Sequence, residues 1–258
     1  MKKIHLLLIF LCCFNLINAQ RTDAFKSGEW LKYRMSYSNF LNAGYAELSL
    51  KKTKQKGVEL FHAKGTGKTT GVIGWFFKVR DKYESFFTRN ENRPVHFVRR
   101  VNEGGHIISR DIYFNNVDST AHIKNHKRKT EKVMSVNDVQ DMISAVYKLR
   151  NEDLCKMKVG EDIAMKLFFD YESYDFKMRY IGKEIIRTKF GKVDCLKFRP
   201  IVQAGRVFRE EESVTVWISN DDNKIPLKVK ASLAVGSLRA DLDAFKGLAN
   251  PFNIIYKN

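Results

Sequence analysis

Hydrophobic and polar positions alternate residue by residue along most of the chain, the pattern of strands with one buried face. In residues 28–38, for example, Leu31, Tyr33 and Met35 fall on one side and charged residues on the other. Further segments that predict strands are residues 45–51, 58–63, 73–88, 94–100, 107–114, 121–124, 163–171, 176–182, 183–189, 193–200, 213–219 and 225–233. The sequence therefore predicts a mainly β protein.

Turn residues between these segments predict antiparallel hairpins. Gly104-Gly105 and the Asn-Asp-rich residues 220–223 each separate two strand-like runs. Pro226 cannot donate a backbone hydrogen bond, so its strand is expected to begin there or to lie at an edge. With many strands, short connections, and no linker or internal repeat, we expect a large curved antiparallel sheet or open barrel.

A single segment after the N-terminus, residues 136–151, has the period of an amphipathic helix. Its apolar positions recur three and four residues apart and are Val139, Met142, Ile143, Val146 and Leu149. Asn137 or Asp138 is the predicted cap of the first turn. Because a short amphipathic helix among strands must bury its apolar stripe, we expect it to cover or plug the concave side of the sheet.

Residues 1–19 have the layout of a secretory signal peptide, with Lys2 and Lys3 before an apolar run and Ala19 before the expected cleavage point. A lipid-attachment site needs a small residue before its cysteine, and Cys12 and Cys13 lack one. No later run reaches the ~20 apolar residues of a membrane-spanning helix. We therefore expect residues 20–258 to form one exported domain, periplasmic or extracellular, with no transmembrane segment.

The formal net charge of +17 favours anionic partners such as lipopolysaccharide, phospholipid headgroups or acidic glycans. The secretory route argues against nucleic acid. A solvated, lysine-rich surface explains the same charge without any partner. The densest basic run, residues 124–132, has the same two interpretations.

Two cysteines follow the predicted cleavage point, Cys155 and Cys195. In an oxidising compartment they could pair, which would stabilise the fold by roughly 4 kcal/mol. Two buried free thiols agree with the sequence equally well.

The motifs of common catalytic and metal sites are incomplete in this chain. Residues 65–70 resemble a phosphate loop, but His62 stands where the first glycine is needed, so we expect a flexible, basic connection between strands. The histidines have no metal-ligand spacing. Ser144 lies inside the predicted helix and not on a nucleophile elbow. Adjacent acids at residues 210–212 and 221–222 are expected on opposite strand faces or in a turn. We predict neither an enzyme nor a cofactor.

Two groups of side chains are candidates for ligand binding. The aromatic residues Trp75, Phe77 and Tyr83 are expected to lie in the core or to form the wall of an apolar pocket. The polar residues of the predicted helix follow one another at a spacing of three and are Asp141, Ser144, Tyr147 and Arg150. They could bond to strand ends and hold the helix in place, or they could form a ligand site.

A specific set of residues is spread over nearly the whole chain after residue 19. It consists of Gly28, Glu29, Leu31, Tyr33, Gly44, Ala46, Asp81, Tyr83, Glu84, Ser85, Pro94, Asp141, Met142, Ser144, Tyr147, Leu149, Arg150, Gly191, Cys195, Pro200, Trp217, Ile218, Ser219, Asp221, Pro226, Leu227, Gly236 and Ser237. With these residues the chain resembles the exported bacterial family known as domain of unknown function 3108. The resemblance implies a β-rich envelope or periplasmic domain without an assigned activity.

A looser likeness is to the periplasmic lipoprotein carriers, in which a curved antiparallel sheet and helices enclose an apolar cavity. Together these observations favour a non-enzymatic binding domain of the cell envelope, whose sheet and helix accept a lipid or other apolar ligand. The alternative is a structural or assembly module that binds an envelope protein or an anionic glycan.

Overall fold

The computed structural model describes residues 23–38, 41–201, 214–233 and 236–256. The predicted signal peptide, residues 1–19, and the acids at residues 210–212 lie outside the described residues.

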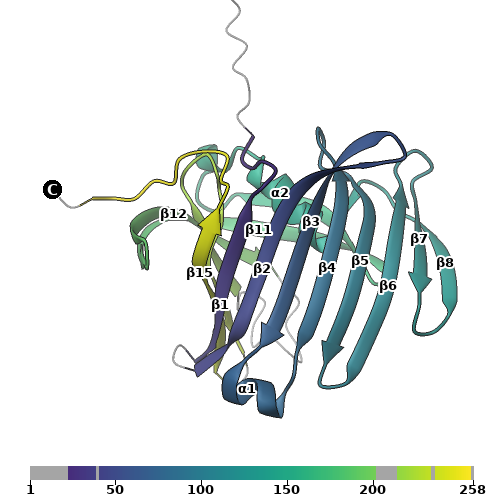
Figure 1. Cartoon of the computed structure of the whole chain (residues 1–258). Helices are drawn as coiled ribbons and strands as arrows, with labels where there is room; N and C mark the ends of the chain where they lie inside the picture. Colours follow the sequence, from purple (N-terminus) through teal and green to yellow (C-terminus); the bar gives the residue numbers. More distant parts are fainter. Residues whose placement is uncertain (1–22, 39–40, 202–213, 234–235, 257–258) are drawn as a thin grey trace, which may run out of the picture.

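The strands that the structure describes form one continuous 15-stranded sheet (Figure 1). The strands are β1 (Trp30–Tyr37), β2 (Leu41–Gln55), β3 (Val58–Thr69), β4 (Arg80–Thr88), β5 (Pro94–Glu103), β6 (His106–Asn115), β7 (Thr120–Asn125), β8 (Thr130–Ser135), β9 (Val139–Gln140), β10 (Asp162–Phe169), β11 (Glu172–Thr188), β12 (Gly191–Ile201), β13 (Val214–Ser219), β14 (Pro226–Ser232) and β15 (Ser237–Lys246). Within the described ranges, three short helices accompany them, α1 (Gly71–Phe76), α2 (Met142–Arg150) and the 3-10 helix η1 (Leu154–Lys156).

Neighbouring strands are antiparallel, except that β9 runs parallel to β10. The order is β8 to β1, then β15 to β9, so the pairing of β1 with β15 joins two wings of the sheet. We call β1–β8 the first wing and β9–β15 the second wing. The curved, largely antiparallel sheet confirms the predicted fold class.

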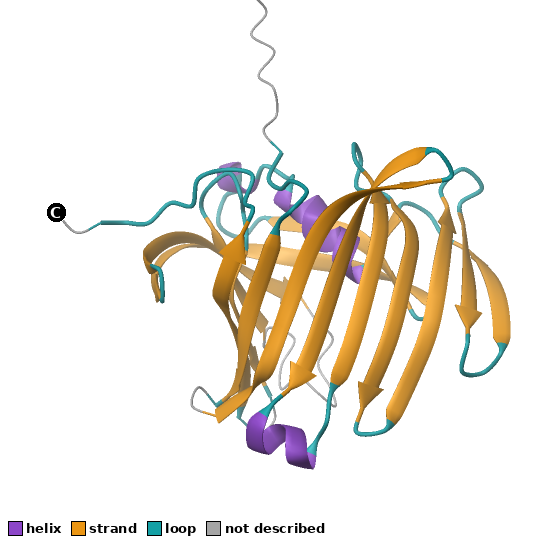
Figure 2. Ribbon diagram, in the orientation of Figure 1, coloured by secondary structure: helices purple, strands orange, loops and turns teal. Residues whose placement is uncertain are grey.

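Helix α2 lies between the two wings (Figure 2). On one side Ile143 and Tyr147 belong to a buried cluster with Phe87 of the first wing. On the other side Leu149 packs with Phe198 of the second wing. The helix therefore joins both wings through a core that side chains fill.

The helix is shorter than the sequence predicted, because it begins at Met142 and not near residue 136. Neither Asn137 nor Asp138 is its cap. Asp141 caps it, since its carboxylate accepts the N–H groups of Ile143 and Ser144 at 2.8 and 2.9 Å, and the Ser144 hydroxyl accepts the N–H of Asp141. This reciprocal capping box satisfies backbone donors that would otherwise be buried without partners.

Two local predictions in the first wing differ from the structure. Residues 73–88 were expected to be strands, which is correct for β4, but the chain forms α1 before it. Residues 65–70 were expected to be a flexible connection, but residues 65–69 belong to β3. At Gly65 a Cβ would lie 3.5 Å from the Ile143 side chain, an ordinary van der Waals distance, so α2 packs directly over β3 at this position.

Other local predictions are confirmed. Gly104 and Gly105 both have positive φ and form the β5–β6 turn. β13 and β14 pair across the 220–225 connection, and β14 begins at Pro226. The disulfide alternative is wrong, since both cysteines are free, with Cys155 exposed and Cys195 buried. Burial raises the pKa of the Cys195 thiol to about 12.

Candidate functional site

The polar residues of α2 point into the protein. Asp141, Ser144, Tyr147 and Arg150 are all buried. Besides the two backbone N–H groups, the Asp141 carboxylate accepts the hydroxyl of Ser85 on β4 at 2.6 Å. Burial raises the pKa of Asp141 to about 6, although these hydrogen bonds act in the opposite direction. Asp141 thus fixes the start of the helix to the first wing.

Arg150 fixes the other end of the helix. Its guanidinium donates to both carboxylate oxygens of Glu29 at 2.6 Å, and to the backbone oxygens of Ala24 and Asn223 at 2.9 Å. Burial alone would lower the pKa of Arg150, but the hydrogen bonds to Glu29 more than offset this and the pKa is raised. Asn223 lies between β13 and β14, so Arg150 links the second wing to the chain before β1.

Several residues that carry the family resemblance pair with one another. Besides Glu29 with Arg150 and Ser85 with Asp141, the Tyr33 hydroxyl donates to the Pro226 carbonyl at 3.0 Å. All three pairs join segments far apart in sequence, and the two that involve Asp141 and Arg150 hold the helix between the wings. We conclude that Asp141 and Arg150 belong to a structural framework, as the bonding alternative predicted. The buried Tyr147 hydroxyl differs from that prediction, because it has no hydrogen-bond partner among the described residues.

The three aromatic candidates do not form one pocket. Trp75 is 87% exposed on α1, while Phe77 follows α1 and is half exposed. Tyr83 lies on β4, where its ring stacks with that of Phe97 at a centroid distance of 6.3 Å. The predicted common wall of an apolar pocket is therefore absent for these three residues, because α1 turns Trp75 and Phe77 outward.

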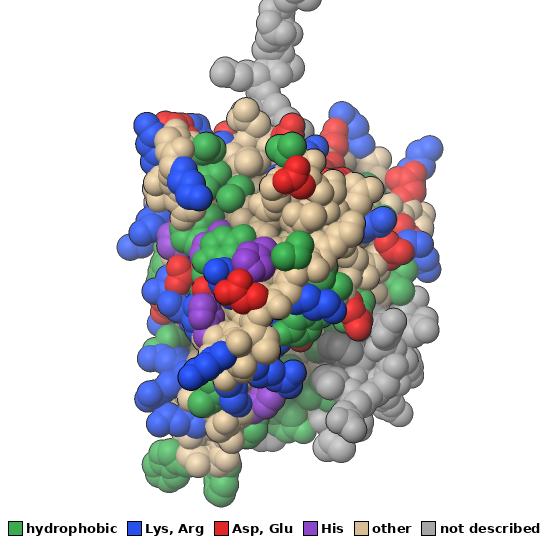
Figure 3. Space-filling view, turned by 90° about the vertical axis from the view of Figure 1, so that its right-hand side faces the viewer, with side chains coloured by type: hydrophobic (Ala, Val, Ile, Leu, Met, Phe, Trp, Pro, Cys, Tyr) green, Lys and Arg blue, Asp and Glu red, His purple; other side chains and the backbone are tan. Residues whose placement is uncertain are grey.

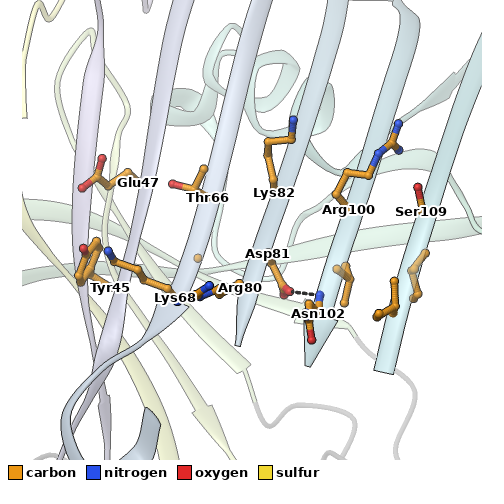
Figure 4. Close-up of a pocket in the computed structure, with 14 residues that line it drawn as sticks. Tyr45, Glu47, Thr66, Lys68, Arg80, Asp81, Lys82, Arg100, Asn102 and Ser109 are labelled. Carbon is orange, nitrogen blue, oxygen red and sulfur yellow. Dashed lines mark hydrogen bonds between the residues drawn. The ribbon is translucent and has the colours of Figure 1, made fainter. Parts of the chain in front are cut away.

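A groove of about 780 Å³ crosses β2 to β6 on the face of the first wing that is turned away from α2 (Figure 4). Apart from Asp81, its labelled side chains lie in two cross-strand rows. One row holds Glu47, Thr66, Lys82, Arg100 and Ser109, and the other holds Tyr45, Lys68, Arg80 and Asn102, with Ile107 next in register. Each row takes one residue from each of five strands.

The groove is lined by four cations and two carboxylates. Lys82 pairs with Glu84, and Arg100 pairs with Asp111, both at 2.8 Å. Among the described residues, Lys68 and Arg80 have no carboxylate within 4.0 Å. Lys68 instead lies over the Tyr45 ring, 4.6 Å from its centroid.

The two acids of the groove already accept hydrogen bonds. Glu47 accepts the indole N–H of Trp30 at 3.2 Å, and Asp81 accepts the backbone N–H of Asn102 at 3.2 Å. Lys68 and Arg80 are therefore the cations best placed to meet an incoming anion.

A row of stacked rings lies on the same face, further along the strands. His62, Phe86, His96 and Tyr113 come from β3 to β6, with centroid distances of 4.1, 5.3 and 4.3 Å and nearly parallel planes. We call these four residues the ring ladder. Burial lowers the pKa of His62 and of His96, which favours neutral imidazoles. Figure 3 shows histidines gathered with hydrophobic and acidic side chains on one side of the molecule.

Neither the groove nor the ring ladder was identified from the sequence. Their members are separated along the chain and become neighbours only through the strand register. The sequence signal for the groove was the alternation of lysine or arginine with other residues in residues 64–68 and 78–82. We expected a flexible connection at the first of these segments and an aromatic-rich strand at the second.

In the part of the chain that the structure describes, no group of three histidine, cysteine or acidic residues is arranged to hold a metal ion. The same residues contain no helix of the length and apolar character needed to cross a membrane.

Comparison with one solved structure supports the fold. A β-barrel-like protein of the domain of unknown function DUF1849 from Brucella abortus is similar, with a TM-score of 0.55 and 10% identity over 84% of this chain and 96% of that chain. A protein described as a "putative exported protein with YmcC-like fold", from Bacteroides fragilis, matches over 86% of this chain and 97% of that chain, with 8% identity and a TM-score of 0.34. No curated protein matches the chain. The family model described as "Protein of unknown function (DUF3108)" matches residues 32–243, and the chain therefore belongs to the DUF3108 family.

Proposed function

We propose that this protein is a non-enzymatic binding domain of the cell envelope, which holds an anionic group of an envelope component in the groove across β2–β6. The observation that carries the proposal is the pair Lys68 and Arg80. They are cross-strand neighbours in the groove, and among the described residues neither has a carboxylate partner. The net charge of +17 adds a long-range attraction for anions.

The groove has the chemistry to hold a phosphate or carboxylate. Arg80 offers a planar guanidinium that matches two oxygens of such a group, and Lys68 adds a point charge. Thr66 and Ser109 supply hydroxyls at its sides, and the Tyr45 ring supplies an apolar wall. A groove open across five strands suits one segment of a larger molecule, such as a phosphorylated glycan or a lipid headgroup.

An apolar ligand beneath α2 is less well supported than an anion in the groove. The apolar residues Ile143 and Leu149 of α2 are packed against core side chains of the two wings. Asp141 and Arg150, which have the chemistry for acid–base work, are buried and bonded to protein groups. We therefore assign binding and no reaction to this domain, at the exported location that residues 1–19 predict.

Titration with lipopolysaccharide and with its dephosphorylated form tests the proposal. We expect the Lys68→Ala/Arg80→Ala variant to bind the phosphorylated form at least about tenfold more weakly, because each phosphate contact is charge-assisted. Raising the salt concentration should weaken wild-type binding in the same direction.

The matched control is Lys158→Ala/Lys183→Ala, which removes the same charge from exposed positions outside the groove. Equal losses in the two double variants would show that only net charge matters and would reject the groove as the site. The proposal also fails if wild-type protein does not distinguish the phosphorylated from the dephosphorylated form.

A further inference from the structure

The connection between β3 and β4 ends in an exposed apolar tip, formed by α1 and the residue after it. Val72, Trp75, Phe76 and Phe77 are 53%, 87%, 85% and 51% exposed, and no residue of α1 is buried. We call these four residues the α1 tip. It lies at the lower end of the first wing in Figure 2. Contiguous large apolar side chains that face solvent mark an interaction site more often than a structural one.

The base of the α1 tip is held firmly by the sheet. The Thr69 hydroxyl donates to the Phe77 carbonyl at 3.0 Å and accepts the N–H of Val79 at 2.9 Å. One edge of the Phe77 ring packs on the β5–β6 turn, where a Cβ on Gly104 would lie only 2.7 Å from the ring. These contacts anchor the backbone on both sides of α1, which lowers the ordering cost of binding through Trp75 and Phe76.

The sequence around the α1 tip is rich in cations. Residues 64–80 contain no acid, and Lys68, Lys78 and Arg80 flank the apolar residues. Glu103 lies beside Val79 on the neighbouring strand, so cations outnumber acids near the tip but are not the only charges there. In Figure 3 hydrophobic side chains project at the lower end of the molecule, beyond lysine and arginine side chains. Tryptophan favours the boundary between lipid headgroups and acyl chains, and nearby cations are attracted to anionic lipids.

We propose that the α1 tip inserts into the surface of an anionic phospholipid bilayer. Trp75 and Phe76 enter the boundary between headgroups and acyl chains, and Lys78 lies at the level of the lipid phosphates. A bilayer fits this feature better than a protein partner, since the tip is a protruding end whose own segment, residues 64–80, carries only cations, and insertion needs no matching hollow. The inference goes beyond the proposed function, because insertion does not require a ligand in the groove.

Vesicle binding tests the inference with a chain that starts at Gln20. This chain keeps every described residue and lacks the apolar N-terminal run, which would itself bind lipid. Vesicles of equal parts phosphatidylglycerol and phosphatidylcholine are compared with phosphatidylcholine alone by co-sedimentation. We expect the wild-type protein to bind the anionic vesicles. Trp75→Ser/Phe76→Ser should bind them at least about tenfold more weakly, and Lys78→Ala should lose less affinity than this double variant. Tryptophan emission should shift to shorter wavelength on binding, and Trp75→Phe should bind but lose most of this shift.

The control is Val117→Ser, which removes an apolar side chain 93% exposed at the opposite end of β6 and should bind vesicles like wild type. Melting temperatures of all variants should match, because none of the altered side chains is buried. Undiminished vesicle binding by Trp75→Ser/Phe76→Ser would overturn the inference. It is also overturned if the tip instead mediates self-association or capture of an envelope protein, with no vesicle binding. Because Lys78 and Trp75 lie outside the groove, failure here leaves the result of the lipopolysaccharide titration intact.

Discussion

Arg150 and Arg80 show how two regions of this molecule use the same side chain differently. Arg150 lies between the wings, where Glu29 and two backbone oxygens occupy its donors. Arg80 lies in the groove, where the described residues provide no carboxylate partner. A buried guanidinium must be bonded within the protein because its desolvation is costly, whereas a guanidinium at an open groove can remain available to a ligand. Burial therefore distinguishes side chains that hold the fold together, such as Arg150, from side chains that remain available to a ligand, such as Arg80.

The largest effect expected from this comparison is the loss of one partner of the buried ion pair. Arg150→Met leaves Glu29 buried without its guanidinium, and we expect the free energy of unfolding to fall by about 3–5 kcal/mol. Urea denaturation followed by circular dichroism measures the change. Adding Glu29→Leu to Arg150→Met should restore part of the loss, because the unpaired charge is removed. If Arg150→Met costs no more than a surface substitution, the framework role of Arg150 is wrong.

The second effect concerns Asp141 and pH. Its pKa is about 6 in the folded chain against 3.8 in the unfolded chain, because it is buried. Folding therefore favours the protonated form, and this contribution to stability is complete below pH 3.8 and is lost as the pH rises through about 6. The loss is on the order of 3 kcal/mol.

Asp141→Asn should remove this part of the pH dependence while keeping an oxygen to accept the N–H groups of the cap. Urea denaturation at several pH values between 4 and 7 would show a flatter profile for the variant than for wild type. Parallel profiles would mean that Asp141 does not titrate in this range. Ser144→Ala is a useful control, since it disturbs the same capping box without removing the titrating group.

A smaller effect is expected at the ring ladder. Burial lowers the pKa of His96 below 6.5, while Asp111 and Glu84 act to raise it and Arg100 and His62 act to lower it. As the pH falls, His96 therefore binds a proton at a higher pH in the unfolded chain than in the folded chain. The free energy of unfolding consequently decreases as the pH falls below 6.5. His96→Phe keeps a stacked ring and should weaken this decrease, which thermal melts between pH 5 and 7.5 can detect. An unchanged pH profile would exclude His96 as the cause.

The smallest stability change is expected in the groove. Arg80→Met should alter the free energy of unfolding by no more than about 0.5 kcal/mol, because it breaks no carboxylate pair in the described chain. The same variant should lose affinity for phosphorylated lipopolysaccharide. The free energies of unfolding of Arg80→Met and Arg150→Met together test whether the buried arginine stabilises the fold and the exposed one does not. A strong destabilisation by Arg80→Met would place Arg80 in the framework as well.

Much of the fold could be predicted because its signals are local. The alternation at Leu31, Tyr33 and Met35 predicts a strand wherever it lies in the sheet, and Gly104-Gly105 predicts a turn from two residues alone. The helix start was misplaced because Asn137 and Asp138 are themselves good cap residues, and the buried Ser85 hydroxyl and the β9 pairing that favour Asp141 are not visible in the sequence. For α1, aromatic residues alone could not distinguish a buried strand from an exposed helix.

The candidate binding surfaces could not be predicted, since they depend on which strands become neighbours. Lys68 and Arg80 belong to one groove because β3 pairs with β4 in one register, and Arg150 meets Glu29 across 121 residues of chain. Side-chain chemistry and strand periodicity are local properties of a chain and can be recognised from the sequence alone. Register, burial and the path of the sheet around α2 arise from the packing of all strands together. Only the three-dimensional structure therefore shows which polar residues line the groove and which are buried in the framework.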